Sequence, residues 1–120
     1  MSITHLEPAA IWRNFSALNA VPRPSKKEER VIAFMKNFGH SLGFETRVDE
    51  TGNVIILKPA TPGMEGRKKV ILQSHLDMVC QKNNDTVFDF DTQGIRMVAD
   101  GDWVRAEGTT LGADNGIGVA

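Results

Sequence analysis

The sequence predicts an α/β fold. Two amphipathic helical patterns open the chain, and short runs rich in β-branched residues follow them. One of these runs, residues 69–74, has an unbroken apolar centre, which is typical of a strand buried on both faces inside an α/β sheet. A chain of 120 residues with 41% hydrophobic and 24% charged residues suffices for one core. We therefore expect one domain or part of one.

The first helix is predicted over residues 7–20. Ile11, Phe15 and Leu18 recur at helical spacing and would share one buried face. The proline-rich segment 21–24 would end this helix, because proline cannot continue the hydrogen-bond ladder.

The second helix is predicted to begin at Ser25. Its hydroxyl would cap the first turn, and Glu28 would complete a capping box. Gly43 would end the helix in the left-handed conformation. The expected buried stripe consists of Val31, Met35, Phe38 and Leu42.

Three strands are predicted next. Residues 44–49 and 53–59 would pair as a hairpin through residues 51–52, since the turn contains glycine and the second strand is rich in β-branched residues. After a loop at residues 61–66, residues 69–74 would form the buried strand.

The last third of the chain is predicted to hold one more hairpin and the start of a helix. Residues 81–92 are polar and predict a long loop. Residues 95–99 and 103–107 flank the Asp-Gly pair at 100–101, which favours a two-residue turn. From Asn115 onward the pattern resembles a first helical turn.

Charge and composition exclude several classes of partner. The net charge of −1 provides no field that would attract nucleic acid or an anionic membrane. No signal peptide and no apolar stretch of about 20 residues is present, so we expect no membrane partner. A single cysteine, Cys80, excludes an internal disulfide framework, and we expect a cytoplasmic protein.

A histidine and two aspartates predict half of a metal site. His75 directly follows the predicted strand 69–74, and Asp77 lies two residues on as a supporting carboxylate. Asp114 lies between Gly112 and Gly116, and its two oxygens could bridge cations about 3.5–4 Å apart. Taken singly, His75 could be an ordinary core or surface histidine, Asp77 a turn residue, and Asp114 a helix N-cap.

Two rival sites are weaker. Cys80 could ligate zinc or act as a nucleophile activated by His75, but a buried structural thiol is the favoured interpretation. Residues 89–94 resemble the opening of a calcium loop, yet position twelve of that loop would be Asp100 instead of glutamate. A hairpin also follows where the exiting helix would be required.

Three segments together closely resemble a known family. They are residues 21–29 (VPRPSKKEE), 74–82 (SHLDMVCQK) and 108–116 (GTTLGADNG). Each is similar to the corresponding motif of the aminoacylhistidine dipeptidases (Xaa-His dipeptidases, peptidase D). These belong to the co-catalytic zinc exopeptidases related to aminoacylase and glutamate carboxypeptidase. The resemblance covers residues 6–120.

The resemblance implies a fold and roles for the three candidate residues. The fold would be a three-layer catalytic domain with a mixed sheet between helices, of which residues 1–120 are the N-terminal portion, ending before the lid or dimerisation domain. His75 would bind one zinc ion, and Asp114 would bridge both. Asp77 would be the catalytic carboxylate that supports the site. A cis peptide is expected after the bridging aspartate.

The resemblance also implies an activity for the full-length enzyme. It would hydrolyse dipeptides, of the Xaa-His type or more broadly, through a water activated by two zinc ions, with cobalt or manganese as possible substitutes. It would be a cytoplasmic homodimer. The family's general-base glutamate and its remaining ligands fall outside this sequence, so we expect the 120 residues alone to be inactive. Alternatives are a non-enzymatic metal-binding or interaction module, and a cysteine-dependent hydrolase.

Overall fold

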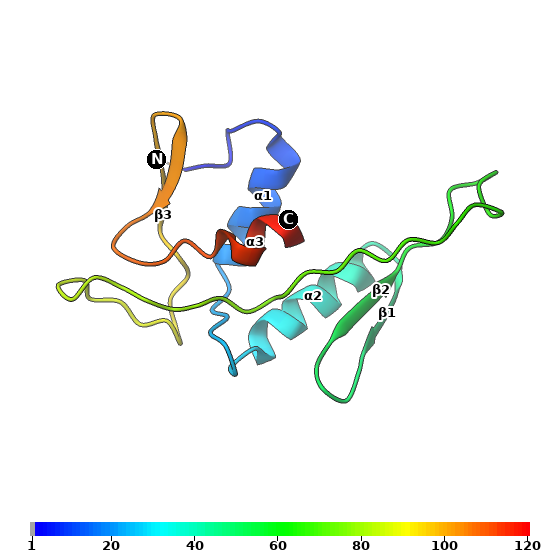
Figure 1. Cartoon of the computed structure of the whole chain (residues 1–120), viewed down its shortest axis with the longest axis horizontal. Helices are drawn as coiled ribbons and strands as arrows, with labels where there is room; N and C mark the ends of the chain where they lie inside the picture. Colours follow the sequence, from blue (N-terminus) through cyan, green and yellow to red (C-terminus); the bar gives the residue numbers. More distant parts are fainter. Residues whose placement is uncertain (1) are drawn as a thin grey trace. The chain divides into compact units, whose positions relative to one another are not determined.

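The computed structural model describes residues 2–120 and contains three helices and four strands within them (Figure 1). The helices are α1 (Ala9–Asn19), α2 (Glu29–Ser41) and α3 (Ala113–Val119). The strands are β1 (Glu45–Val48), β2 (Val54–Leu57), β3 (Met97–Asp100) and β4 (Trp103–Ala106).

The chain divides into two compact units. The first comprises the residues up to Val31 together with Ser74–Ala120, and the second comprises Ile32–Gln73, so that α2 begins in one and continues in the other. All the buried hydrophobic side chains among residues 2–120 belong to the first unit: Ile3, Phe15, Leu18, Val31, Met78 and Phe88. The first unit therefore holds the core.

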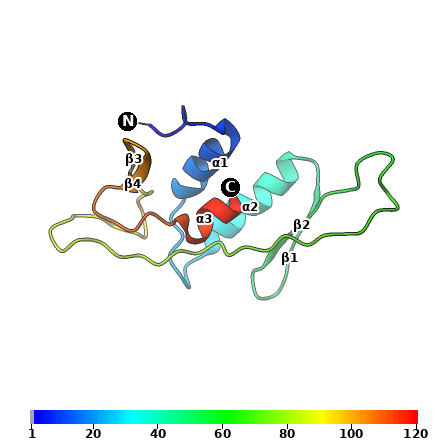
Figure 2. The ribbon, with the colours of Figure 1, turned by 45° about the horizontal axis from the view of Figure 1, so that its top comes forward.

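Helix α1 forms where it was predicted. It begins two residues later and ends one residue earlier than the predicted range of 7–20. It starts after Pro8, whose ring suits a position at a helix N-terminus. Phe15 and Leu18 are fully buried, as expected, whereas Ile11 is partly exposed. Helix α3 lies beside α1 (Figures 1 and 2), and the Asn14 side chain donates a 3.0 Å hydrogen bond to the Ala120 carbonyl.

The predicted start of α2 at Ser25 is wrong. The helix begins at Glu29, because Pro24 forms a β-bridge with Met78 and the chain at residues 25–26 is a turn; the Ser25 hydroxyl donates to Asp77. Glu28 accepts a 2.6 Å hydrogen bond from the Lys26 N–H, and Lys26 is left-handed with φ 69°. Residues 25–28 therefore form a turn that precedes the helix.

The predicted stripe of α2 is only partly buried. Val31 is fully buried and Met35 is half-buried, but Phe38 and Leu42 are exposed. Gly43 has φ 74° and ends the helix region in the predicted left-handed conformation.

The second unit is built on the predicted hairpin of β1 and β2, which pair antiparallel with Val48 opposite Val54. Helix α2 approaches this hairpin at Gly39. A Cβ there would lie 2.2 Å from the Thr46 hydroxyl and 3.1 Å from an Ile56 side-chain carbon, so only glycine permits the contact.

The predicted strand at residues 69–74 is not formed. No described residue pairs with it, and the side chains of Val70, Ile71 and Leu72 are 78%, 92% and 92% exposed. A strand needs a neighbour for its N–H and C=O groups, and residues 2–120 do not supply one. Both sheets of the described chain are two-stranded and antiparallel, so the implied mixed sheet is absent from this part.

The hairpin of β3 and β4 forms with its turn shifted by one residue. Asp100 pairs with Trp103, which leaves Gly101 and Asp102 as the turn instead of residues 100–101. Gly101 has φ 60°, the left-handed value that glycine supplies in such turns. The predicted loop at 81–92 is confirmed.

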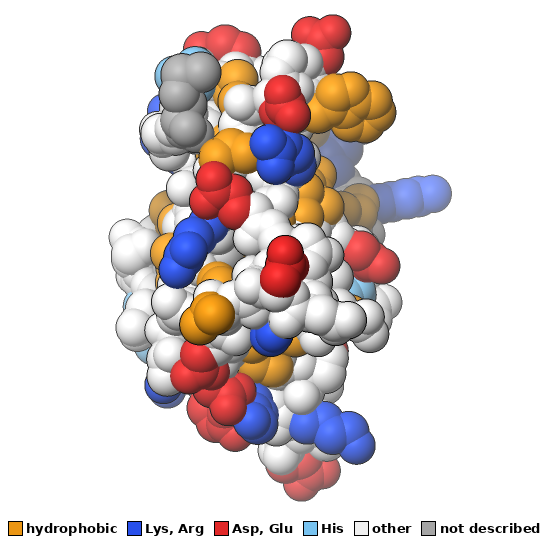
Figure 3. Space-filling view, turned by 90° about the vertical axis from the view of Figure 1, so that its left-hand side faces the viewer, with side chains coloured by type: hydrophobic (Ala, Val, Ile, Leu, Met, Phe, Trp, Pro, Cys, Tyr) orange, Lys and Arg blue, Asp and Glu red, His pale blue; other side chains and the backbone are white. Residues whose placement is uncertain are grey.

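The surface matches the balanced composition. Figure 3 shows acidic and basic side chains interspersed on one face of the molecule, as the net charge of −1 suggests. Among residues 2–120, every helix falls short of the length and apolar character required to cross a membrane.

Candidate metal centre

The three motif segments meet inside the first unit. The Met78 N–H donates a 3.0 Å hydrogen bond to the Arg23 carbonyl, which joins segment 21–29 to segment 74–82. The Thr110 N–H donates a 2.8 Å hydrogen bond to the Gln81 carbonyl, which joins segment 74–82 to segment 108–116. The backbone thus brings together residues that are far apart in the sequence.

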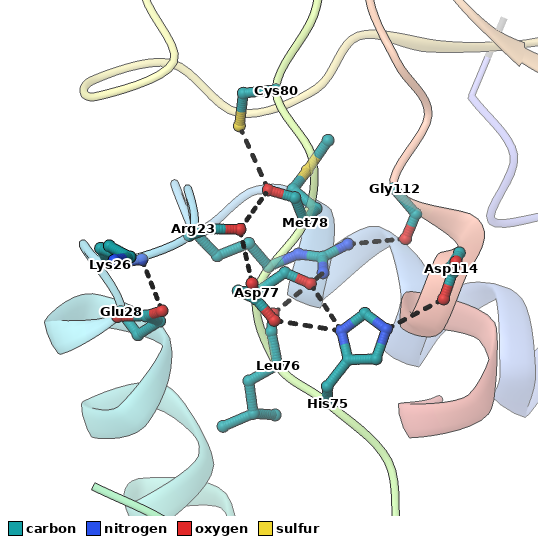
Figure 4. Close-up of polar contacts among 11 residues, drawn as sticks. Arg23, Lys26, Glu28, His75, Leu76, Asp77, Met78, Cys80, Gly112 and Asp114 are labelled. Atoms are coloured by element: carbon teal, nitrogen blue, oxygen red, sulfur yellow. Dashed lines mark hydrogen bonds and ion pairs between the residues drawn. The ribbon is translucent and has the colours of Figure 1, made fainter. Parts of the chain in front are cut away.

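The three predicted site residues lie together (Figure 4). His75 Nε2 is 2.9 Å from Asp114 Oδ1, across a sequence separation of 39 residues. His75 Nδ1 lies 3.0 Å from the Asp77 carbonyl and 3.1 Å from Asp77 Oδ1. The peptide bond between Asp114 and Asn115 is cis, which confirms the expectation raised by the family resemblance.

Both ring nitrogens of His75 face acceptors. A carbonyl only accepts, so the Nδ1 position carries a proton and donates to Asp77. The hydrogen bond to Asp114 is the main cause that raises the pKa of His75 above its ordinary value, and burial opposes it. A cation that takes the place of the Nε2 proton would meet one nitrogen and one carboxylate oxygen.

The donor set fits a zinc ion. Imidazole nitrogen and carboxylate oxygen are both zinc ligands, and two ligands of one tetrahedral zinc lie about 3.3 Å apart. The observed 2.9 Å needs only a small opening of the pair. The Asp114 side chain is 92% exposed and its Oδ2 accepts no hydrogen bond from the described residues. Two donors are not a complete shell, and residues 2–120 contain no group of three or more ligating side chains placed to hold a metal.

Asp77 is held as an anion that faces His75. The Ser25 hydroxyl donates a 2.5 Å hydrogen bond to its Oδ2, and this is the main cause that lowers the pKa of Asp77. The other oxygen, Oδ1, faces the imidazole. A carboxylate behind a ligating histidine orients the ring and makes it a better donor, the supporting role predicted for Asp77.

Sequence reasoning assigned no role in this site to Arg23, which is only 1% exposed. Its guanidinium donates to the carbonyls of Leu76 and Asp77 on one side and of Gly112 on the other, at 3.0, 3.4 and 2.8 Å (Figure 4). The resemblance of segment 21–29 was the only signal in the sequence. An arginine between two prolines otherwise indicates an exposed turn.

Neither rival site is favoured by the geometry. The Cys80 thiol contacts the Met78 carbonyl at 3.6 Å, has no hydrogen bond to His75 among residues 2–120, and has its pKa raised chiefly by burial. A nucleophilic cysteine needs a lowered pKa, because the thiolate is the reactive form. The Asp89 carboxylate already accepts hydrogen bonds from the Asp91 N–H and the Thr92 hydroxyl, so it serves a local turn.

Comparisons with known proteins support the resemblance found in the motifs. The cytosol non-specific dipeptidase of Escherichia coli (strain K12) is 50% identical over 118 residues, which are 98% of this chain and 24% of that protein. A crystal structure of aminoacylhistidine dipeptidase from Vibrio alginolyticus matches with a TM-score of 0.95 and 51% identity, over 99% of this chain and 24% of that one. No family model matches the chain.

The predicted similarity to aminoacylhistidine dipeptidase is therefore confirmed over nearly the whole chain. The chain spans about a quarter of the length of both proteins that it matches. The fold of the chain matches part of the solved dipeptidase.

Proposed function

We propose that this chain is the N-terminal part of a metal-dependent dipeptidase and supplies two of the ligands of a two-zinc centre, His75 and Asp114. The observation that carries the proposal is the 2.9 Å separation of His75 Nε2 and Asp114 Oδ1, two classical zinc donors brought together from two distant motifs. The similarity to two dipeptidases over the same residues supports it.

Each residue has one task in this proposal. His75 presents Nε2 to one ion while its Nδ1–H donates to Asp77. Asp77 keeps its negative charge beside the imidazole because Ser25 donates to it. Asp114 has two carboxylate oxygens and would hold both ions. When bound, the two zinc ions would supply an activated water and polarise the peptide carbonyl.

The rest of the machinery would come from residues outside this sequence. They include the general-base glutamate, a neighbouring glutamate ligand, and an aspartate and a histidine that complete the shell. The 120 residues alone then have little or no hydrolytic activity. Two ligands also bind zinc far more weakly than a full shell.

The substrates would be dipeptides, including those with a C-terminal histidine. The full-length protein would act in the cytoplasm as a homodimer. Cobalt or manganese could replace zinc, because nitrogen and oxygen donors accept all three metals.

Metal analysis combined with dipeptide hydrolysis on the full-length protein tests the proposal. We expect His75→Ala and Asp114→Ala each to lose bound zinc and hydrolysis together. The matched controls are His40→Ala, near the end of α2, and Asp102→Ala, in the turn between β3 and β4, which remove the same side chains away from the site. Both controls should keep wild-type zinc and activity.

Two results would contradict the proposal. Unchanged zinc content in both site variants would place the metal elsewhere. Activity that survives removal of metal by a chelator, but is lost in Cys80→Ala, would instead support a cysteine-dependent hydrolase.

A further inference from the structure

We propose that Arg23 is a positioning residue for the candidate metal centre: its buried guanidinium sets the distance between the segment that carries His75 and the segment that carries Asp114. This inference rests on the proposed function, since it concerns the geometry of the same two ligands. It assigns a purpose to a buried charge that makes no contact with either ligand side chain.

The guanidinium spans both segments. Nη1 donates to the carbonyls of Leu76 and Asp77, the two residues that follow His75, at 3.0 and 3.4 Å. Nη2 donates to the carbonyl of Gly112, two residues before Asp114, at 2.8 Å. One rigid planar group thus fixes the backbone next to both ligands.

The glycines around Asp114 leave room for this contact. A Cβ on Gly112 would lie 2.6 Å from Arg23 Nη2, and a Cβ on Gly116 would lie 2.8 Å from the same atom. Any larger residue at either position would displace the guanidinium. The close approach of Arg23 therefore explains why both positions that flank Asp114 are glycine.

Asn19 holds the guanidinium from the other side. Its side-chain oxygen accepts a 2.7 Å hydrogen bond from Arg23 Nη2, and its amide nitrogen donates to the Leu111 carbonyl at 2.8 Å. Asn19 is itself only 1% exposed. The pair ties the end of α1 to the segment that leads into Asp114.

This arrangement is costly for a group with only a structural role. Burial lowers the pKa of Arg23 against smaller raising effects of Cys80 and Asp77. Its Nε is buried with no hydrogen-bond partner among residues 2–120. A buried charge is expensive even when most of its hydrogen bonds are made, and an apolar side chain of similar length would fill the same space. Three of its four hydrogen bonds instead fix backbone carbonyls beside the metal ligands, and the fourth goes to the Asn19 side chain.

The test measures zinc affinity of the full-length protein by competition with a chromophoric chelator. We expect Arg23→Met to raise the zinc dissociation constant about 10- to 100-fold, the range found when groups that orient metal ligands are removed. The absorption spectrum of the cobalt-substituted variant should also change, because the spectrum reports coordination geometry.

Two control variants separate positioning from general stability. Leu18→Ala empties a core position in the same unit, so it should lower the melting temperature but leave zinc affinity and the cobalt spectrum unchanged. Arg105→Met removes an arginine that pairs with Asp100 within its own hairpin, and it should change neither property.

Arg23→Lys keeps the positive charge but lacks the planar guanidinium that reaches both segments. It should therefore bind zinc as weakly as Arg23→Met. If Arg23→Met does not fold, Arg23→Lys decides the question. Wild-type zinc affinity in Arg23→Lys, or an equal loss in Leu18→Ala, would overturn the inference while leaving the proposed function intact. A wild-type protein that binds no zinc would overturn both.

Discussion

Ser25 donates a 2.5 Å hydrogen bond to the carboxylate of Asp77, 52 residues further along the chain. Lys26, the next residue in the chain, is left-handed with φ 69°, and α2 starts four residues later than the capping box predicts. The same hydrogen bond keeps Asp77 ionised next to His75. A residue that resembles a local helix signal is thus part of the support of the candidate metal centre.

Removal of the Ser25 hydroxyl should weaken metal binding. We expect Ser25→Ala in the full-length protein to raise the zinc dissociation constant about tenfold, the lower end of the range for groups that orient metal ligands, because Asp77 loses the donor that aligns it. Chelator competition measures this change. Ser25→Thr keeps the hydroxyl and should stay near the wild-type value. Equal affinity in all three proteins would show that the contact does not support the site.

A methyl group at Gly116 should destabilise the first unit. Its Cβ would lie 2.8 Å from Arg23 Nη2 and 2.8 Å from an aromatic carbon of Phe15, so Gly116→Ala should lower the free energy of unfolding by about 1–3 kcal/mol. Chemical denaturation measures the difference. Gly66→Ala is the matched control, because no described residue beyond its two chain neighbours comes within 4 Å of a Cβ there, and it should be neutral or slightly stabilising.

The hairpin of β1 and β2 should depend on pH through Asp49. Hydrogen bonds from the side chain and N–H of Asn53 and from Thr51 lower the pKa of Asp49 to about 2. A carboxyl whose folded pKa is depressed stabilises the fold fully above its ordinary pKa of 3.8 and loses that contribution as the pH falls through about 2. The hairpin should therefore weaken between these two pH values.

Nuclear magnetic resonance titration of the Asp49 carboxyl carbon measures this pKa. We expect Asn53→Ala to raise it towards 3.8, since the Asn53 side chain is the largest cause of the shift. Asn37→Ala, on α2, should leave it unchanged. An Asp49 that titrates normally in the unmodified chain would contradict the prediction.

The exposed segment 70–72 should respond oppositely in the short chain and in the full-length protein. A segment with an unpaired backbone and exposed apolar side chains promotes association, so Ile71→Lys should raise the solubility of the 120-residue chain. In the full-length protein, where we propose that the segment is a buried strand, the same lysine should cost several kcal/mol of stability. Val87 is 93% exposed in a loop, so Val87→Lys should change neither the solubility of the short chain nor the stability of the full-length protein.

Light scattering of the short chain and chemical denaturation of the full-length protein measure the two effects. If Ile71→Lys left the stability of the full-length protein unchanged, residues 69–74 would not be a buried strand there.

Local patterns predicted most of the elements. The spacing of Phe15 and Leu18 predicted α1 and its buried face, and Gly43 predicted the end of the α2 region. Glycine at 52 and 101 predicted both hairpins, with an error of one residue in the second turn. These signals succeed because side-chain spacing and glycine conformation act over a few residues.

Two predictions failed because a tertiary partner decided them. The strand at 69–74 needs neighbouring strands that residues 2–120 do not provide, whatever its own composition favours. The helix start at Ser25 failed because the neighbouring Pro24 pairs with Met78 from a distant segment, and Lys26 is left-handed. Propensity is a weak prior when contacts with distant residues fix the backbone of the same segment.

By itself, the sequence determined which residues can carry metal chemistry: His75, Asp77 and Asp114 stand in motifs whose residue types are those of zinc ligands and their supports. Only the tertiary structure decided that His75 and Asp114 lie 2.9 Å apart, and that Arg23 is buried between their segments. The physical reason is that the terminal nitrogens of a buried guanidinium need acceptors, and here the backbone carbonyls that accept come from both candidate ligand segments at once. The residue spacing within any one segment does not predict these contacts between segments.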